Sequence, residues 1–509
     1  MRKNFIKGLA LAMAVCMGVV GCGSNSSSSS KTPDSSNAPQ SSSEEKSTPA
    51  GDESSSAEES STTDTTSLYP AYDLGGITLT LLNGNDLAAR NPAGTEDEFQ
   101  KQERQEWLDY IQEKYNVTLQ FVDSPASEWD DTPQEIVNAY TAGKPLADIM
   151  DVYYNWIFPL IANDIIYDMT DLFADDNTYQ ESHVLEFLGG TWGVCSAISG
   201  EGLYYNADMI KNAGMEYTPA EMFDMGMWDY DNFYKYLVEL KANMAEDEYP
   251  LFVAPYYWSL FASAANGIRM MDEKTGQLNY LNDAYLETME FIQKLVNEGL
   301  AAIPDQDENG SYNNWGYPGN TFDQGTTVAM AHRAAWQAAG LVDKFDLGYV
   351  PYPWGSNVTV DADKVGESGA YLTLSDNYGS SYYDGQVITF TKGVEEKADL
   401  MQLTSMMAEL MKWDSFLTSY EGESITPAEW LETGTIDSDL YLFARGREHL
   451  EFYNSVDLDF TLAFNGPVYG NQSIRSVMQS AYNADMALMV EAGYADKSLY
   501  NPVDVETTE

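Results

Sequence analysis

Residues 146–173, LADIMDVYYNWIFPLIANDIIYDMTDLF, decide the fold class of this 509-residue chain. The stretch opens with a strand-like run, residues 146–153, and a Tyr-Tyr-Asn-Trp cluster follows at residues 153–156. Open α/β sheets bind their ligands at the carboxyl ends of parallel strands. The stretch therefore predicts both a strand of such a sheet and one edge of a ligand site.

Two more strand-like runs precede this one, GITLTLLNGN (76–85) and NVTLQFVD (116–123), and a helical segment follows each of them. The first helix is expected to open with a capping box at Thr95–Glu98, and the second covers Pro133–Ala142. The apolar side of the first helix is expected to include Phe99, Trp107, Ile111 and Tyr115. The order strand, helix, strand, helix, strand predicts a parallel, open α/β sheet.

Helical periodicity returns further along the chain. Apolar residues recur at helical spacing in residues 228–242 and in 283–299, where Gly299 is expected to end the helix. Two more helices are predicted, one from about residue 395 to 412 and one within 473–494. The body from Leu68 to Glu509 exceeds what a single core usually holds, so two lobes are expected.

The N-terminus reads as an export signal. Three basic residues precede a short apolar run from Leu9 to Val20, which is too short for an ordinary transmembrane helix. The boundary Val-Val-Gly-Cys22 resembles the bacterial lipobox, so residues 1–22 are predicted to be a lipoprotein signal peptide with Cys22 as the lipidated residue. A plain signal peptide with a chance cysteine is the alternative. Residues 23–67 lack large apolar side chains and are predicted to be a disordered tether.

Charge and cysteine content exclude several classes of protein. The formal net charge is −54, which repels phosphate backbones, so nucleic acid is not an expected partner. Besides Cys22, the mature chain keeps only Cys195, so no structural disulfide is expected. We interpret Cys195 as a small buried filler rather than a nucleophile.

Segments spread across the body resemble the extracellular solute-binding proteins of ABC importers, in particular the maltodextrin-binding-like group. Residues 146–173 are similar to the family's strand and aromatic loop. Four further segments are similar to family segments in the same order: GEGLYYNADMIKNAGM (200–215), MWDYDNFYKYLVEL (227–240), TFDQGTTVAMAHRAAWQAAGL (321–341) and FDLGYVPYPWG (345–355). The chain departs from the family at residues 357–383, a polar insertion, and in the tail after Trp413.

This resemblance implies a two-lobed periplasmic-binding-protein-like (type II) α/β fold that closes on its ligand about a hinge. The first lobe is expected to take residues 74–189 and 317–385. The second is expected to take 190–316 and 386–509, with hinges near these joins. The resemblance also implies a lipid-anchored protein on the extracytoplasmic face of the bacterial cell membrane, which works as a monomer with the transmembrane subunits of an ABC permease.

A sugar presents apolar C–H faces and a rim of hydroxyls, so its site needs aromatic platforms beside Asp, Asn, Gln or Arg side chains. Three aromatic and polar clusters fall where the resemblance places cleft loops. Trp156 and Trp258 are expected to be stacking platforms, with the remaining candidates being Tyr154, Tyr257, Trp336, Asn85, Asn155 and Arg333. Asn83 ends the first strand, and the rim is expected to include Trp354, Tyr382 and Tyr383.

No cofactor is expected, and the histidines show no zinc-ligand spacing. Residues 305–310, Asp-Gln-Asp-Glu-Asn-Gly, have the opening spacing of a calcium loop. The position that should supply a bidentate glutamate is Gly316, however, and an acidic surface turn is the commoner explanation of such a run.

The sequence leaves three functions open. The first is a sugar or oligosaccharide binder that delivers its ligand to a permease, with no enzymatic activity. The second is an exported glycoside hydrolase, which needs two facing carboxylates. The 80 acidic residues make such pairs by chance, so carboxylates cannot separate these two. The third is a binder of peptides or another non-sugar solute on the same fold, and the richness in aromatic residues weighs against it.

Overall fold

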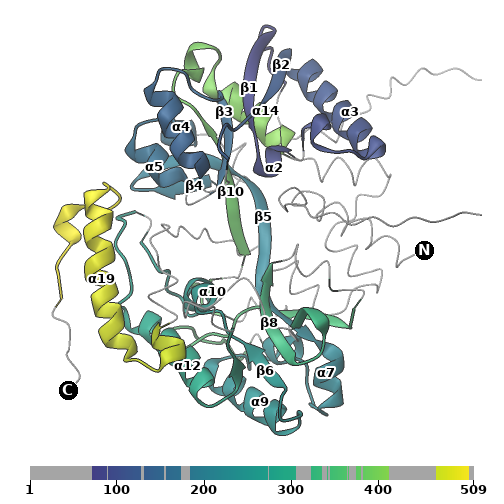
Figure 1. Ribbon diagram of the computed structural model, residues 1–509, viewed down its shortest axis with the longest axis vertical. Helices are drawn as coiled ribbons and strands as arrows, with labels where there is room; N and C mark the ends of the chain where they lie inside the picture. The colour runs from purple at the N-terminus through teal and green to yellow at the C-terminus, as the bar shows by residue number, and fades with distance from the viewer. Residues whose placement is uncertain are drawn as a thin grey trace, which may run out of the picture.

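The computed structural model describes residues 71–88, 90–127, 131–153, 156–173, 184–272, 274–304, 322–334, 341, 344–363, 365, 374–379, 382–411 and 466–503. Two lobes lie one above the other in Figure 1, and the long strands β5 and β10 run between them. The predicted signal peptide, Cys22 and the tether lie outside the described residues. Within the described part, no helix combines the length and apolar character that a bilayer-spanning segment needs.

The first lobe is built on the predicted parallel sheet. β1 (Ile77–Asn83) pairs in parallel with β2 (Val117–Asp123) and with β3 (Ile149–Tyr153), so the expected α/β order is confirmed. β10 (Tyr382–Phe390) completes this part of the sheet antiparallel to β3. The helices of the lobe are α2 (Asn85–Ala88), α3 (Glu98–Tyr115), α4 (Thr132–Thr141), α5 (Ile157–Ala162), α6 (Thr170–Phe173) and α14 (Leu400–Leu410).

Helix α3 begins two residues later than the capping box predicted. Asp97, not Thr95, is its N-cap and accepts hydrogen bonds from the backbone N–H groups of Phe99 and Gln100. Phe99 therefore falls in the first turn, where 65% of its surface is exposed, whereas the other predicted apolar positions of α3 are buried. Asp97 is a better N-cap than Thr95 here because its carboxylate satisfies two unpaired N–H groups at the positive end of the helix dipole.

A buried carboxylate fastens α14 to α3. Glu409 accepts hydrogen bonds from the hydroxyls of Tyr110 and Tyr115, at 2.8 and 2.6 Å, and from the ammonium of Lys114 at 2.5 Å. Its side chain is almost fully covered. Because three donors from one helix satisfy this carboxylate, α14 is locked to α3 in one register, which places residues 400–410 firmly in the first lobe.

Strand β5 (Gly190–Asn206) belongs to both lobes. Its first part pairs with β4 (Val184–Phe187) and with β10, both in the first lobe. Its last part, residues 201–206, pairs with β8 (Val328–Ala334) and β9 (Leu347–Val350) in the second. One continuous strand thus carries the chain from one lobe to the other.

The second lobe also contains parallel strand pairs. β6 (Tyr249–Phe252) pairs in parallel with β7 (Ala301–Ala302) and with β8. The helices predicted from apolar spacing are α9 (Tyr230–Ala242) and α12 (Asp283–Asn297). The other helical segments are α7 (Ala207–Asn212), α8 (Pro219–Asp224), α10 (Pro255–Tyr257), the π-helical turn η5 (Trp258–Ala262) and α11 (Ser263–Ala265).

The lobe boundaries differ from those expected from the sequence. Residues 317–385 were expected in the first lobe, but β8 and β9 pair with β5 in the second-lobe sheet, and β8 also pairs with β6. Conversely, residues 386–411 were expected in the second lobe, but β10 pairs with β3 and α14 packs on α3. The chain returns to the first lobe through β10, after β8 and β9 rather than before them as the resemblance implied.

The C-terminal helix α19 (Ile474–Glu491) packs on the second lobe through α12. Asp485, on the side of α19 that faces residues 277–285, is partly buried beside Tyr280. Burial raises the pKa of Asp485 to about 6, and the neighbouring Tyr280 hydroxyl only partly opposes that shift. Asp485 therefore titrates close to neutral pH.

We expect Asp485→Asn to stabilise the protein at pH 7.5 and not at pH 4. An aspartate in an unfolded chain titrates near 3.9, so the folded state holds this proton more tightly. The stability from that proton is fully present below about pH 4 and is lost as pH rises through about 6. Asparagine mimics the neutral form, so the gain at pH 7.5 should be about 1 kcal/mol after allowing for partial exposure.

Urea unfolding at the two pH values measures this difference, and Asp496→Asn is the matched control. The pKa of Asp496 is lowered by hydrogen bonds from Ser498, so its substitution should give no stabilisation at pH 7.5. An Asp485→Asn variant that is less stable than the parent at pH 7.5 would contradict the assignment.

Candidate ligand-binding faces between the lobes

The carboxyl ends of parallel strands in the two lobes face each other. Helix α2 follows β1 directly and lies on the edge of the first lobe toward the second, while α10 follows β6 and lies on the opposing edge (Figure 1). Ligands of open α/β sheets bind outside the carboxyl ends of the strands. We therefore take these two edges as the candidate site and call them the first-lobe face and the second-lobe face.

The first-lobe face is polar. Asn83 at the end of β1 donates from Nδ2 to the carboxylate of Asp123 at the end of β2, at 2.7 Å. The side chain of Asn91 in turn donates to Asn83 Oδ1 at 3.1 Å. Asp151, buried in β3, accepts from the backbone N–H of Leu87 and so holds α2 against the sheet. This edge therefore presents a connected row of amide and carboxylate groups.

Trp156 lies beside this row as the N-cap residue of α5. Its ring lies 6.5 Å from that of Tyr153 at the end of β3, tilted by 49°. Only 6% of Trp156 is exposed. The structure thus places it at the predicted strand end, but mostly as part of the first-lobe packing.

The second-lobe face is aromatic. The ring of Tyr257 stacks on the imidazole of His332, with centroids 4.0 Å apart and planes 21° apart. Phe261 stacks on the same imidazole at 5.5 Å, and the Tyr352 hydroxyl lies 2.8 Å from His332 Nδ1. His332 is buried and Tyr257 is only half-buried. Tyr257 therefore forms the outer layer of a stack whose inner layers are fixed.

Trp258, the neighbour of Tyr257, is wholly buried. Its ring meets Tyr352 edge-on at 5.0 Å and lies 6.2 Å from Phe233 of α9. The structure therefore gives Trp258 a place beneath the second-lobe face, within the core, and offers no exposed ring surface on which a sugar could stack. Its predicted role as a platform would need the ring to move.

Arg333, predicted as a polar partner for a ligand, is buried at the end of β8. Its Nε and Nη2 donate to one carboxylate oxygen of Asp323 at 2.9 and 2.6 Å, and its Nη1 donates to the His332 carbonyl at 2.6 Å. Burial lowers the pKa of Arg333 to about 9. This guanidinium braces the crossing strand, since residue 333 pairs with Gly202 of β5.

The remaining candidates are only partly seen. Tyr154, Asn155, Trp336 and the possible calcium loop 305–310 lie outside the described residues. Asn85 is placed as the first residue of α2, and Tyr382 and Tyr383 are placed in β10, but their side chains are not described. Trp354, expected at the rim, is instead buried against Phe223 and Tyr378.

Two residues of the first-lobe face were not predicted, Asp123 and Asn91. Asp123 ends the second strand-like run, so the rule that placed Asn83 at a strand end could have found it as well. Asn91 had a weaker signal, an Asn-Pro step, and it proves to be the N-cap of the short 3₁₀ turn η1 (Pro92–Gly94).

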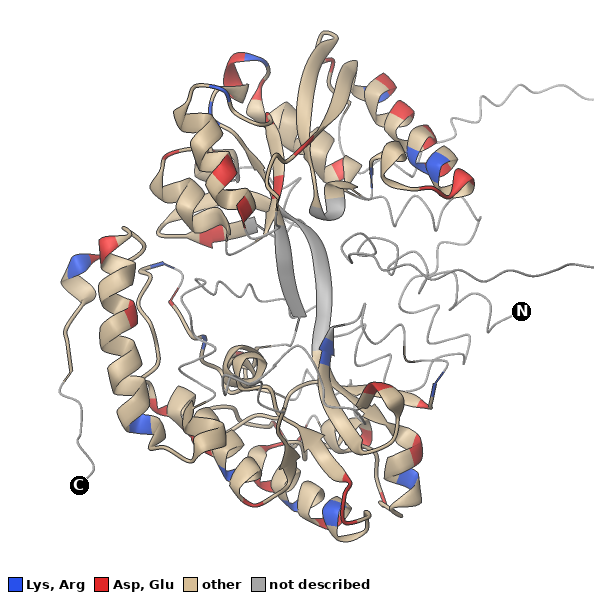
Figure 2. Cartoon of the chain, viewed as in Figure 1, with Lys and Arg blue, Asp and Glu red and all other residues tan. Residues whose placement is uncertain are grey.

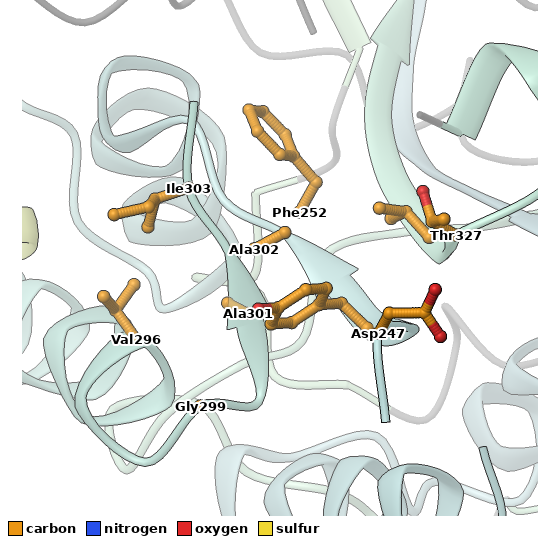
Figure 3. A pocket seen from close by; sticks show the side chains of 10 residues that line it. Asp247, Phe252, Val296, Gly299, Ala301, Ala302, Ile303 and Thr327 are labelled. Carbon is orange, nitrogen blue, oxygen red and sulfur yellow. The ribbon is translucent and has the colours of Figure 1, made fainter. Parts of the chain in front are cut away.

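A separate cavity of 450 Å³ lies elsewhere in the second lobe (Figure 3). It is lined by the starts of β6 and β8, where Asp247, Tyr249 and Thr327 lie, and by Val296 and Ile303 around β7. Apolar side chains make up most of this lining, and it runs along β6 from Tyr249 to Phe252 rather than gathering at the carboxyl ends of the strands. The rule for open sheets therefore favours the facing edges over this cavity.

Charge and metal chemistry add little to the site. On the described helices of both lobes, Lys and Arg are interspersed with Asp and Glu rather than gathered in one patch (Figure 2). Among the described residues, no group of three or more His, Cys, Asp or Glu side chains could hold a metal ion.

Comparison with known protein families decides the class. Residues 93–379, more than half of the chain, match the bacterial extracellular solute-binding protein family. The chain belongs to this family. It is therefore a binding protein rather than an enzyme, and the glycoside hydrolase hypothesis is set aside. No curated protein matches the sequence.

Solved structures of binding proteins share the fold of this solute-binding protein. The sugar-binding protein MalE of Xanthomonas citri aligns over 82% of this chain and 98% of its own, at 12% identity and a TM-score of 0.56. The cyclic alpha-maltosyl-1,6-maltose binding protein of Arthrobacter globiformis aligns over 82% of this chain and 100% of its own, at 13% identity and a TM-score of 0.56. The GacH receptor of Streptomyces glaucescens, solved with acarbose, aligns over 82% of this chain and 99% of its own, at 16% identity and a TM-score of 0.50.

We expect Trp258→Ala to destabilise this binding protein by about 3–5 kcal/mol, because truncating a buried ring loses its transfer energy and leaves a cavity. Trp258→Phe should lose less, because it keeps most of the apolar volume. Urea unfolding measures both variants. The exposed Tyr217 is the control, and Tyr217→Ala should stay within about 0.5 kcal/mol of the parent. A loss below about 1 kcal/mol for Trp258→Ala would show that this ring is not a core residue.

Proposed function

We propose that this chain is the lipid-anchored substrate-binding component of an ABC importer and that it captures a sugar or oligosaccharide between its lobes. The observation that carries the proposal is the pairing of the two faces. Tyr257 offers a supported ring on one side, and the Asn83–Asp123 pair offers amide and carboxylate groups on the other. A sugar needs both kinds of surface, because its faces are apolar and its rim is made of hydroxyls.

The relatives support a carbohydrate ligand. The structures from Xanthomonas citri and Arthrobacter globiformis are described as binding proteins for sugar and for a cyclic maltose derivative, and GacH was solved with acarbose. Their sequence identity to this chain is low, so they support the class of ligand and leave the particular sugar open.

Capture would work by closure of the lobes. A ligand that touches only one lobe binds the open and closed arrangements equally well and shifts nothing. A sugar whose face rests on Tyr257 and whose hydroxyls reach Asn83 and Asp123 gains contacts only when both lobes meet it. Closure then follows from these added contacts.

Anchoring and delivery are proposed from the sequence and the family. The lipobox-like Cys22 and the polar tether of residues 23–67 suit a protein held at the outer face of a membrane by lipid. Delivery to the transmembrane subunits of a permease is the role that follows for such a binding protein.

We expect calorimetry against a panel of oligosaccharides to detect at least one ligand that binds without being cleaved. Tyr257→Ala should weaken that binding about tenfold, because a stacked aromatic contact contributes about 0.5–1.5 kcal/mol beyond the area it buries. Tyr234→Ala is the matched control, since Tyr234 is a half-buried tyrosine on α9, at the end of the second lobe remote from the first (Figure 1).

Equal affinities of the two variants would remove Tyr257 from the site. A panel in which no sugar binds, while a peptide or another solute does, would replace the carbohydrate proposal with the non-sugar alternative. Release of shorter sugars would contradict a pure binding role.

A further inference from the structure

The C-terminal residues leave the second lobe and reach the first. We call residues 466–503, with α19 at their centre, the C-terminal strut. Its base is tied to α12, where Gln293 Nε2 donates to the carbonyls of Pro467 and Gln472 at 2.6 Å each. From there α19 runs along the molecule, and its far end lies level with α5 of the first lobe (Figure 1).

A hairpin of the second lobe, residues 270–281, accompanies the strut. Met271 and Leu278 form its bridge, and the backbone N–H of Leu278 lies 3.3 Å from the sulfur of Met486 on α19. At its turn, Gly276 has φ +70°, and a Cβ there would lie 1.9 Å from the carbonyl oxygen of Tyr494. Only glycine fits this contact, so the turn fixes the backbone of Tyr494.

Tyr494 then reaches across to the first lobe. Its ring packs on Phe158 of α5, with centroids 5.5 Å apart and planes 53° apart. Phe158 is buried and also meets Phe187 edge-on at 4.7 Å. Phe187 ends β4 and pairs with Gly190, the first residue of the crossing strand β5. Three rings thus connect the strut with the root of the strand that joins the lobes.

The contact between Tyr494 and Phe158 lies close in sequence to the first-lobe face. Phe158 lies two residues after Trp156, on the short helix that follows the aromatic cluster at the end of β3. Any rotation of one lobe against the other must either carry Tyr494 along with Phe158 or separate them, because the strut is tied to the second lobe and α5 belongs to the first. The contact therefore couples the lobe arrangement to the position of this turn.

We propose that Tyr494 is a positioning residue: its packing on Phe158 braces the two lobes and sets their resting arrangement, outside the ligand-binding faces. An aromatic pair of this kind shifts an equilibrium roughly twofold to tenfold. The consequence for ligand affinity rests on the proposed function, because apparent affinity scales with the fraction of protein in the binding-competent arrangement. The brace itself does not depend on which ligand binds.

The test measures the separation of the lobes with no sugar added. Spin labels at Glu106→Cys on α3 and Lys235→Cys on α9, both exposed positions, report the interlobe distance by pulsed electron paramagnetic resonance. The full chain is used, with its three native cysteines, Cys16, Cys22 and Cys195, replaced by serine. Tyr494→Ala should broaden or shift the distance distribution, whereas Tyr494→Phe keeps the ring and should leave it unchanged.

Gly276→Ala provides a second route to the same effect, because its Cβ would displace the Tyr494 carbonyl. Hydrogen exchange of the α19 amides shows whether the strut stays docked. An unchanged distribution in Tyr494→Ala with α19 still protected overturns the proposal. If α19 loses protection, Phe158→Leu decides from the first-lobe side: a shifted distribution supports the brace, and an unchanged one overturns it.

Failure of the brace and failure of the proposed function remain distinguishable. The distance measurement contains no ligand, so a protein that binds no sugar can still show the brace. Conversely, a protein that binds sugar with unaltered lobe distances in Tyr494→Ala keeps its proposed function and loses only the brace.

Discussion

Both candidate ligand-binding faces depend on strand β5, which is part of the sheets of both lobes. Its pairing passes from β10 in the first-lobe sheet to β8 in the second, with register shifts in the β10 ladder between Tyr383 and Val387. Two glycines let neighbouring side chains lie across it. A Cβ at Gly193 would lie 2.1 Å from a methyl carbon of Val387, and one at Gly202 would lie 2.4 Å from the ring of Tyr349. Side chains at these points would push β10 or β9 away, so the close packing of both strands on β5 depends on these glycines.

The two lobes present different kinds of side chain to each other, polar ones on the first-lobe face and aromatic ones on the second-lobe face. The first lobe offers amides and a carboxylate at the ends of β1 and β2, held by their own hydrogen bonds, and the second offers a ring supported from below. Neither face alone meets both requirements of a sugar. Under the proposed function, this division would make sugar binding depend on both lobes at once, which is the physical condition for a ligand to drive closure.

The sequence predicts the sheet better than the lobe boundaries. Hydrophobic runs are local, so β1, β2 and β3 and the helices α9 and α12 appear where periodicity places them. The assignment of β8 and β10 to a lobe depends on partner strands far away in the sequence, which no local pattern encodes. Asn83 and Trp156 lie near the strand ends where the sequence predicts them. Whether a predicted ring is buried, as Trp354 is, depends on packing that composition cannot reveal.

The adjacent pair Tyr257 and Trp258 shows why. Consecutive residues of a helical turn point about 100° apart, so two neighbouring rings cannot both face a ligand. Here Trp258 points into the core and Tyr257 toward the edge, where it stacks on His332. A ring that stacks on a ligand needs rigid side chains beneath it. Trp258 contributes to that support, because it packs on Tyr352, whose hydroxyl is hydrogen-bonded to His332. Under the proposed function, the indole would support the site from beneath, and the smaller phenol would make the contact with the sugar.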